Sequence, residues 1–399
     1  MRISRPAWGK FVTGATYELS MNSDYRDREG GGLINPSFST TTRLAITQPL
    51  LRSAWEQYNL APLRQARFAE GQSRQRFRRD VQQKVLDVHR AYWELVFTRR
   101  DLEVKRESLA LAERLLEINR VKVRTGVFAP IEIAAAESGV ANRVTDVLVA
   151  ENAVEEASDR LRRLILPFEL ASDWQTEIAT VDVADDRAFE VPDVDRCLDV
   201  ALAERPDLTE LRLGLESAAL AVAAADSDTL PKLDLTGSAQ WTGLATDADD
   251  SITDSFGRRG AETWNVGLVL EVPLGNQTAR GRAAQRRLER DRAVLEYRDR
   301  SISTAEEVRA AFRKVELSRR TIASRRRAEE LKRQELENEQ VKLENKVSTN
   351  FQVLSVQEDL ALRQSELIRA RVDYRIAIAE LAFAMGSTPD VLKWPLATR

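Results

Sequence analysis

Apolar residues recur at every seventh position through the middle of the first half of the chain. One row consists of Val88, Leu95, Leu102, Leu109, Leu116 and Val123. A second row, shifted by two positions, consists of Phe97, Val104, Leu111 and Ile118. A seven-residue repeat is typical of helices that supercoil around neighbours, and two residues are roughly 200° apart on such a helix. The two rows therefore predict a helix with one neighbour on each side, as in a closed ring of helices.

The pattern around these rows predicts two antiparallel helices. The first runs from about 53 to 124 with Pro62 as its only early interruption, and it would be about 100 Å long at 1.5 Å per residue. Gly126 and Pro130 then break the pattern, and a return helix follows over 131–166. Its apolar row again has a spacing of seven and consists of Ile133, Val140, Val147, Val154 and Leu161.

Two segments before the long helix alternate between apolar and polar residues, which is typical of strands with one apolar face. We expect these strands over about 10–20 and 40–50, the second ended by Pro49. The segment 22–38 between them is rich in Asp, Gly and Asn and is predicted to be an exposed loop.

The same order of elements recurs in the second half of the chain. The predicted elements are a helix over 193–227 with Pro206 as a kink or helix start, strands over about 232–243 and 263–274 with a loop over 244–262 between them, and helices over about 278–345 and 351–385. We therefore divide the chain into a first repeat (1–166), a linker with a short strand near 178–183 (167–192), a second repeat (193–387) and a tail (388–399).

A common offset supports this duplication. Adding 220 to the first long-helix row gives Val308, Val315, Ile322, Glu329, Leu336 and Leu343, of which five are apolar. Adding 220 to the return row gives Val353, Leu360, Leu367, Tyr374 and Leu381, all apolar. One offset that fits two helices is hard to obtain by chance. Since the second repeat begins with a helix that the first one does not have, we expect a further N-terminal segment, with any signal peptide, before residue 1.

Composition excludes some partners. The chain is 31% charged and 43% hydrophobic, which is typical of a helix-rich protein with large solvated surfaces. The formal charge of −3 gives no reason to expect nucleic acid as a partner. No run of 18 apolar residues predicts a transmembrane helix.

Catalytic, metal and cofactor chemistry have no support in the sequence. Cys197 is the only cysteine and His89 the only histidine, and they are far apart, which speaks against a zinc site or a Cys–His catalytic pair. We interpret Cys197 as a small core residue and His89 as an ordinary helix residue. The sequence therefore predicts no catalytic residues, no metal, no cofactor and no enzymatic activity.

The strand count predicts an assembly. Four strands cannot close a membrane barrel alone, since about eight is the smallest number. Three copies would supply twelve strands, and strands of about ten residues suit a tilted crossing of a bilayer. The same closure would arrange the long helices as a tube in which each helix touches two neighbours. The fold class is thus mainly α with a small β part, in a trimer with a 12-stranded membrane β-barrel continued by a long α-helical barrel.

Local runs add a resemblance to a known family. They are Ala203–Leu208 (AERPDL), Leu230–Leu235 (LPKLDL), Val272–Leu274 (VPL) and Arg124–Gly126 (RTG) ahead of Ile131–Ile133 (IEI). Together with the duplicated element order, they resemble the TolC-like outer-membrane efflux family over nearly the whole chain.

The resemblance implies a homotrimeric outer-membrane channel of a tripartite efflux or secretion system. Its barrel would lie in outer-membrane lipid and its helical part in the periplasm. A periplasmic adaptor would dock on the helical tips, and an inner-membrane pump would supply the energy. The alternative from another class is a soluble coiled-coil scaffold whose β segments pack on themselves.

The resemblance also implies that the two helix turns bind the adaptor. The residues concerned are Gly126, Val127, Phe128, Ala129 and Pro130 in the first turn, and Lys346, Val347, Ser348, Thr349 and Asn350 in the second. Gly126 has a simpler interpretation as well, because a turn with positive φ needs glycine whatever its partner.

The second tip departs from the family pattern. Lys346 stands where glycine is usual, and Gln352 and Ser355 stand where acidic residues often open the return helix. In a trimer such acids would form a ring that narrows the pore or selects cations. Glu132 is the remaining acidic candidate, so Glu132, Gln352 and Ser355 are the candidates for a pore constriction. Trp241 and Trp264 are either membrane-interface anchors or ordinary cross-strand partners.

Overall fold

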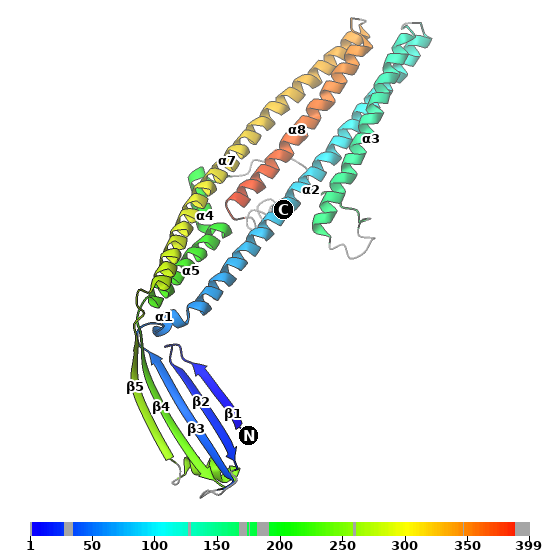
Figure 1. Cartoon of the computed structure of the whole chain (residues 1–399). Coiled ribbons are helices and arrows are strands. Elements are labelled where there is room, and N and C mark those ends of the chain that lie inside the picture. The colour runs from blue at the N-terminus through cyan, green and yellow to red at the C-terminus, as the bar shows by residue number, and fades with distance from the viewer. Residues whose placement is uncertain are drawn as a thin grey trace. The chain divides into compact units, whose positions relative to one another are not determined.

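The computed structural model describes residues 2–27, 35–126, 129–166, 174, 176–181, 191–257, 261–345 and 347–387. These residues form long helices and one five-stranded sheet (Figure 1). The fold class, mainly α with a small β part, is confirmed.

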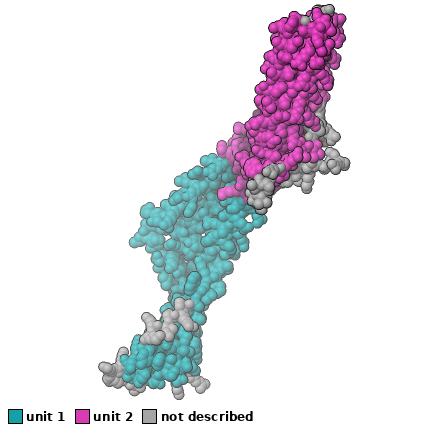
Figure 2. Space-filling model, turned by 90° about the vertical axis from the view of Figure 1, so that its right-hand side faces the viewer, with its two compact units in different colours: residues 1–74, 210–298 teal, residues 75–209, 299–399 magenta. Residues whose placement is uncertain are grey.

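The chain divides into two compact units that each take residues from both repeats (Figure 2). Unit 1 comprises residues 1–74 and 210–298, and unit 2 comprises 75–209 and 299–399. The boundaries of the compact units therefore differ from those of the two sequence repeats.

The sheet belongs to unit 1. Its strands are β1 (Arg2–Lys10), β2 (Thr16–Arg26), β3 (Ser37–Pro49), β4 (Lys232–Ala245) and β5 (Ala261–Glu271). They lie in this order and each is antiparallel to the next.

The predicted strand over 10–20 is wrong at its beginning, because residues 11–15 form a turn and a further strand, β1, precedes it. Phe11 N donates to Ala15 O at 2.8 Å and Gly14 has φ +90°. Any side chain at Gly14 would meet Ser53 O at 2.7 Å. An alternating pattern cannot reveal a reversal that depends on this later segment.

The register gives the sheet one apolar face and one polar face. Leu19, Leu44, Ala239 and Trp264 lie side by side across β2 to β5 on the apolar face. One residue along, Glu18, Ala45, Ser238 and Asn265 lie across the same strands on the other face. Since side chains alternate along a strand, this contrast extends over the sheet.

The predicted loop over 244–262 contains a helix, α6 (Ala248–Phe256). Ser251 hydrogen-bonds Thr40 of β3 at 2.7 Å, and the rings of Phe256 and Trp241 lie 6.1 Å apart. Trp241 also contacts the ring of Trp264 at 6.0 Å, so these tryptophans do form cross-strand contacts. The helix depends on these tertiary contacts, which the polar composition of the segment does not indicate.

The long helices have nearly the predicted bounds. They are α2 (Ala61–Arg124), α3 (Ile131–Ile165), α7 (Gln277–Glu344) and α8 (Asn350–Ala384), and the predicted start of the first helix near 53 is a separate five-residue helix, α1 (Trp55–Asn59). The predicted helix over 193–227 is in fact two, α4 (Val194–Glu204) and α5 (Pro206–Asp228), because Pro206 begins a new helix after the extended Arg205. Residues 176–181 carry no strand, and the rest of the predicted strand near 178–183 lies outside the described residues.

In unit 2 the helices form two hairpins, α2 with α3 and α7 with α8 (Figure 1). The prediction that the long helix has two neighbours is confirmed. Leu95 of α2 packs on Leu161 of α3, whereas Val96 packs on Val372 of α8. The six residues of the +220 row on α7 are all buried, including Glu329.

Candidate functional site

The turn of the first hairpin needs glycine for its backbone. Gly126 has φ +73°, and a Cβ there would meet no atom within 4 Å. Conformation and not space therefore requires this glycine. Ala129 and Pro130 are exposed, and Val127 and Phe128 lie outside the described residues.

The turn of the second hairpin is held by a cap and by a carboxylate. Thr349 is the N-cap of α8, since its hydroxyl accepts from Gln352 N at 3.3 Å. Ser348 donates its hydroxyl to Glu339, and Lys342 Nζ donates to the same carboxylate at 3.0 Å. These bonds, that of Ser348 first, lower the pKa of the Glu339 carboxyl. Lys346 lies outside the described residues.

The two tips are joined directly by one sequence-predicted residue from each. Asn350 Nδ2, at the start of α8, donates to Glu132 Oε2 of α3 at 2.7 Å. Asn350 is fully buried, and its Oδ1 atom has no partner among the described residues. Gln352 and Ser355, by contrast, are exposed on α8. The structure thus brings Glu132 to a residue of the second predicted turn and not to the other two constriction candidates.

Apolar side chains surround the two turns and are exposed. Ile131 is 71% exposed, Val347 76% and Phe351 73%. These three large apolar side chains flank the two turns on α3, on the second turn itself and on α8. We call Ile131, Val347 and Phe351 the tip surface.

A buried arginine outside the predicted site residues links three helices behind the tips. Arg143 of α3 donates to Ser108 Oγ of α2 at 3.1 Å, to Gly139 O at 3.1 Å and to Leu354 O of α8 at 2.9 Å. Burial lowers the pKa of its guanidinium, and the charges of Glu358 and Asp146 offset part of this effect. A signal was present, because Arg143 interrupts a seven-residue row of buried alanines, Ala136, Ala150 and Ala157.

The packing between the hairpins behind the tips is mixed. One apolar cluster joins Ala112 and Leu115 of α2 to Leu343 of α7 and Val353 of α8. Buried amides accompany it: neither polar side-chain atom of Asn119, nor Oε1 of Gln357, has a partner among the described residues. Buried polar atoms without partners weaken packing, so the hairpins are held less firmly here than a purely apolar interface would hold them.

Farther from the tips, a second buried arginine joins α4, α5, α7 and α8. Arg205 binds Asp207 through two bonds of 3.0 and 2.7 Å, Glu307 of α7 at 2.7 Å and Ala384 O of α8 at 3.2 Å. Arg300 of α7 binds the same Asp207 at 2.8 Å. This cluster explains the AERPDL run: Arg205 ends α4, Pro206 starts α5, and Asp207 pairs both arginines.

Electrostatics stabilise the charged forms in this cluster. Burial alone would raise the pKa of the Asp207 carboxyl, but the hydrogen bonds and charges of Arg205 and Arg300 outweigh burial and hold it well below its ordinary value. Burial would likewise lower the pKa of the Arg205 guanidinium, whereas Asp207 and Glu307 raise it overall. The cluster is a network of charges that satisfy one another.

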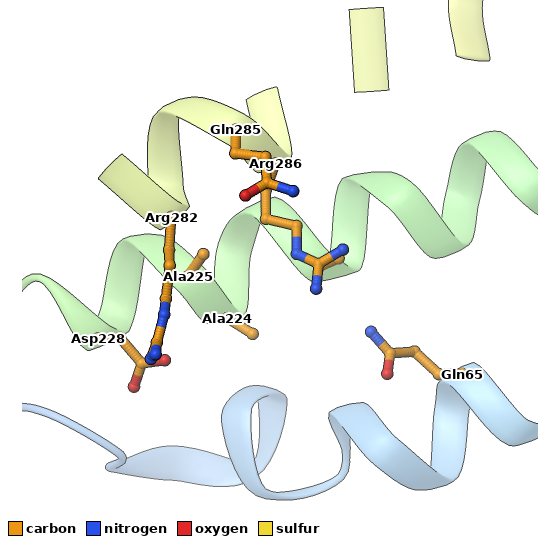
Figure 3. A pocket seen from close by; sticks show the side chains of 8 residues that line it. Gln65, Ala224, Ala225, Asp228, Arg282, Gln285 and Arg286 are labelled. Carbon is orange, nitrogen blue, oxygen red and sulfur yellow. The ribbon is translucent and has the colours of Figure 1, made fainter. Parts of the chain in front are cut away.

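A hollow of about 480 Å³ lies in unit 1 between α2, α5 and the start of α7 (Figure 3). Arg282 points toward Asp228, while Arg286 extends into the hollow on the side of Gln65 (Figure 3). The hydroxyl of Tyr58 donates to Asp228 at 2.8 Å. Alanines of α5 line another part of the wall, so the hollow is a crevice between helices with both polar and apolar sides.

The remaining chemistry-bearing residues have structural positions. Cys197 is fully buried in the core formed by α4, α7 and α8, where burial raises the pKa of its thiol. His89 is half-buried, and burial lowers the pKa of its imidazole. Within the described ranges no group of His, Cys, Asp and Glu side chains could hold a metal ion. Among the described helices, none is both long and apolar enough to span a bilayer.

Comparisons with known proteins agree with this architecture. Residues 15–165 and 197–387 match the profile of the family described as outer membrane efflux protein. The outer membrane protein TolC of Vibrio cholerae is 24% identical over 344 residues, which cover 85% of this chain and 74% of that protein. The alkaline protease secretion protein AprF of Pseudomonas aeruginosa is 24% identical over 357 residues, covering 87% and 70%.

Solved structures show the same fold. The CmeC outer membrane channel of Campylobacter jejuni aligns with a TM-score of 0.71 at 16% identity, over 94% of this chain and 78% of that one. The outer membrane protein VceC of Vibrio cholerae aligns with a TM-score of 0.71 at 15% identity, over 94% and 87%. The family profile covers most of the chain and favours a channel over a soluble scaffold. The chain therefore belongs to the outer membrane efflux protein family, a family of outer-membrane channels and not of enzymes.

Proposed function

We propose that three copies of this chain form the passive exit duct of a tripartite efflux or secretion system. The observation that carries this proposal is the sheet, with its apolar face of Leu19, Leu44 and Trp264 and its polar face of Glu18, Ser238 and Asn265. Strands that face lipid on one side and water on the other have this alternation. Five strands are too few to enclose a pore, so several copies are needed.

In the assembled duct the sheets form the barrel in outer-membrane lipid and the hairpins extend into the periplasm. The tip surface of Ile131, Val347 and Phe351 binds a periplasmic adaptor, together with the turns 126–130 and 346–350. An inner-membrane pump that works with the adaptor supplies the energy. The transported molecule is the one that the pump selects.

The duct opens where the two hairpins of each chain separate. Nearest the tips they are held by two polar links, Asn350 to Glu132 at 2.7 Å and Arg143 to Leu354 O at 2.9 Å, and farther along charged pairs such as Arg369 with Glu94 also join them. When the hairpins separate, water can take the place of either acceptor of the two polar links. The buried amide of Asn119, which has no partner among the described residues, gains hydrogen bonds to water, and this lowers the free-energy cost of separation further. Glu132 contributes a carboxylate at the narrow end, whereas Gln352 and Ser355 add only neutral polar groups there.

Two measurements test this proposal. Purified protein in detergent should have the mass of a trimer, and in planar lipid bilayers it should give stepwise single-channel currents. A monomeric protein without channel currents would overturn it.

Docking is tested separately in cells. A photo-crosslinking residue at Val347 should capture a periplasmic adaptor, and the same residue at exposed Leu317 of α7 should not. Equal capture at both positions would remove the tips as the docking surface.

A further inference from the structure

The outer edge of β2 carries β1, whose direction does not suit a closed ring of copies. β1, β3 and β5 run in one direction, and β2 and β4 run in the other. If β5 of one copy paired with β1 of the next, these two strands would be parallel. If β5 paired with β2, every strand pair in the ring would be antiparallel, as in the transmembrane barrels of outer-membrane proteins.

The side chains of β1 are also out of phase with the sheet. Ala7 lies opposite Leu19 and Gly9 opposite Tyr17, so the smallest side chains of β1 share the apolar face. Trp8 lies opposite Glu18 on the polar face and is 80% exposed. A strand in contact with lipid would have the opposite arrangement.

At the other side of the sheet, β5 has an edge without a neighbouring strand among the described ones. Its apolar residues alternate on the apolar face and are 63% to 84% exposed: Trp264, Val266, Leu268 and Leu270. A long, exposed, apolar edge strand is a template for pairing with another chain. β5 therefore needs a partner strand with the same alternation.

The internal duplication identifies this partner. Thr16 lies opposite Thr47 in the first repeat, and Thr236 lies opposite Gly267 in the second. Both positions differ by the offset found in the helices, since 236 − 16 = 220 and 267 − 47 = 220. In the second repeat, β4 pairs on its other side with β3, the last strand of the preceding repeat. The equivalent partner of β2 is the last strand of another second repeat, which is β5 of a second copy.

We propose that β1 covers the edge of β2 only in the single chain, and that β5 of a neighbouring copy takes its place when the trimer forms. This inference rests on the proposed trimer. Four strands per copy, β2 to β5, then close a ring of twelve. The register of this contact follows from the β3–β4 pair, in which Leu44 faces Ala239 and Ala45 faces Ser238. Adding 220 to the β3 residue gives the residue of β5, and subtracting 220 from the β4 residue gives the residue of β2. Trp264 then faces Leu19 of the neighbour, and Asn265 faces its Glu18, so apolar meets apolar and polar meets polar.

Cysteine cross-linking of the trimer in lipid tests this register. The background is Cys197→Ala, which leaves no other thiol. The two test pairs are Leu19→Cys with Trp264→Cys and Glu18→Cys with Asn265→Cys; they are one step apart, so one of them occupies a site of closer Cα approach. The matched control is Leu19→Cys with Asn265→Cys, whose side chains point to opposite faces. Oxidation should link the chains of at least one test pair into covalent dimers and trimers, and the control should give only single chains.

A second variant asks whether β1 must leave. Ala7→Cys with Leu19→Cys ties β1 to β2 within one chain. Oxidation before membrane insertion should abolish trimer formation, and a reductant should restore it. A conducting trimer that forms with this tie intact, or that never links residues 19 and 264 or 18 and 265, overturns the inference and leaves the proposed channel standing. A protein that forms no trimer under any condition overturns both.

Discussion

Two buried arginines in unit 2 hold helices together with different partners. Arg205 binds the carboxylates of Asp207 and Glu307, and its pKa is raised. Arg143 binds only neutral oxygens, those of Ser108, Gly139 and Leu354, and its pKa is lowered. The first arginine is compensated by opposite charges in contact with it, and the second is not.

This difference separates a permanent joint from a releasable one. In a buried ion pair, the loss of one partner leaves the other charge buried and unpaired. The helices joined at Asp207 are therefore costly to pull apart one at a time. Bonds from Arg143 to a hydroxyl and to carbonyl oxygens can be exchanged for water at little net cost, because water satisfies the same donors. In the proposed duct the two hairpins separate beside Arg143, whereas the Asp207 cluster keeps α4, α5, α7 and α8 together.

The largest expected effect is at Asp207. The Asp207→Ala variant leaves Arg205 and Arg300 without their shared carboxylate, and we expect a loss of roughly 3–5 kcal/mol in the free energy of unfolding. Urea unfolding followed by helical circular dichroism measures it. Asp199→Ala, an exposed carboxylate on α4, is the control and should change little. Equal stability of both variants would show that the cluster is not a joint.

The same carboxyl predicts a dependence on acid. Because its folded pKa is depressed, its contribution to stability is complete above its unfolded pKa of about 4 and is lost as the pH falls toward the folded value. Below pH 4 the wild type should therefore lose up to about 1.4 kcal/mol per pH unit more than Asp207→Asn. Urea midpoints from pH 5 to pH 2 test this, and parallel curves would contradict it.

Arg143→Gln should have a smaller effect on stability and a larger one on opening. It removes bonds from a charged donor to α2 and α8, and we expect a loss of about 2 kcal/mol in the free energy of unfolding. The current through single channels should rise, since the first hairpin is no longer tied to Leu354 of α8. Arg106→Gln, which removes an exposed ion pair with Glu151, is the control. A rise in single-channel current in both variants would show that the loss of any positive charge, and not of the bonds of Arg143, causes the effect.

Gly126→Ala tests the backbone of the first turn and has the smallest expected effect. A side chain at φ +73° is destabilising by about 1 kcal/mol. A Cβ at Gly281 of α7 would also meet no atom within 4 Å, but the φ of this residue is not in the positive region. Gly281→Ala should therefore stabilise by about 0.5–1 kcal/mol. If the requirement is conformational, thermal unfolding should show a loss of stability for Gly126→Ala and a gain for Gly281→Ala. A change of stability in the same direction in both variants would reject it.

The sequence predicts those parts of the fold that depend on periodic rows. The two rows of α2 predict its two neighbours, and the offset of 220 holds in the strand register as well as in the helices. The position of the first turn follows from Gly126 and Pro130, which interrupt the periodic rows. Each of these features follows from a pattern that recurs at a fixed spacing or from a residue that interrupts it.

The joints could not be predicted, because their partners are distant in the sequence. Two of the three acceptors of Arg143 lie 35 and 211 residues away, and the farther one is a backbone oxygen that no side-chain pattern marks. Glu307 lies 102 residues from Arg205. The turn that creates β1 depends on the close approach of Gly14 to Ser53, which alternation within 10–20 does not reveal.

The most direct test of the account is a reversible tie across the tips. Glu132→Cys with Asn350→Cys, in the Cys197→Ala background, replaces the 2.7 Å hydrogen bond between the hairpins by a disulfide. In a planar bilayer the oxidised channel should pass little current, and adding reductant should raise the current above that of the Cys197→Ala protein. The same current before and after reduction would contradict opening by separation of the hairpins.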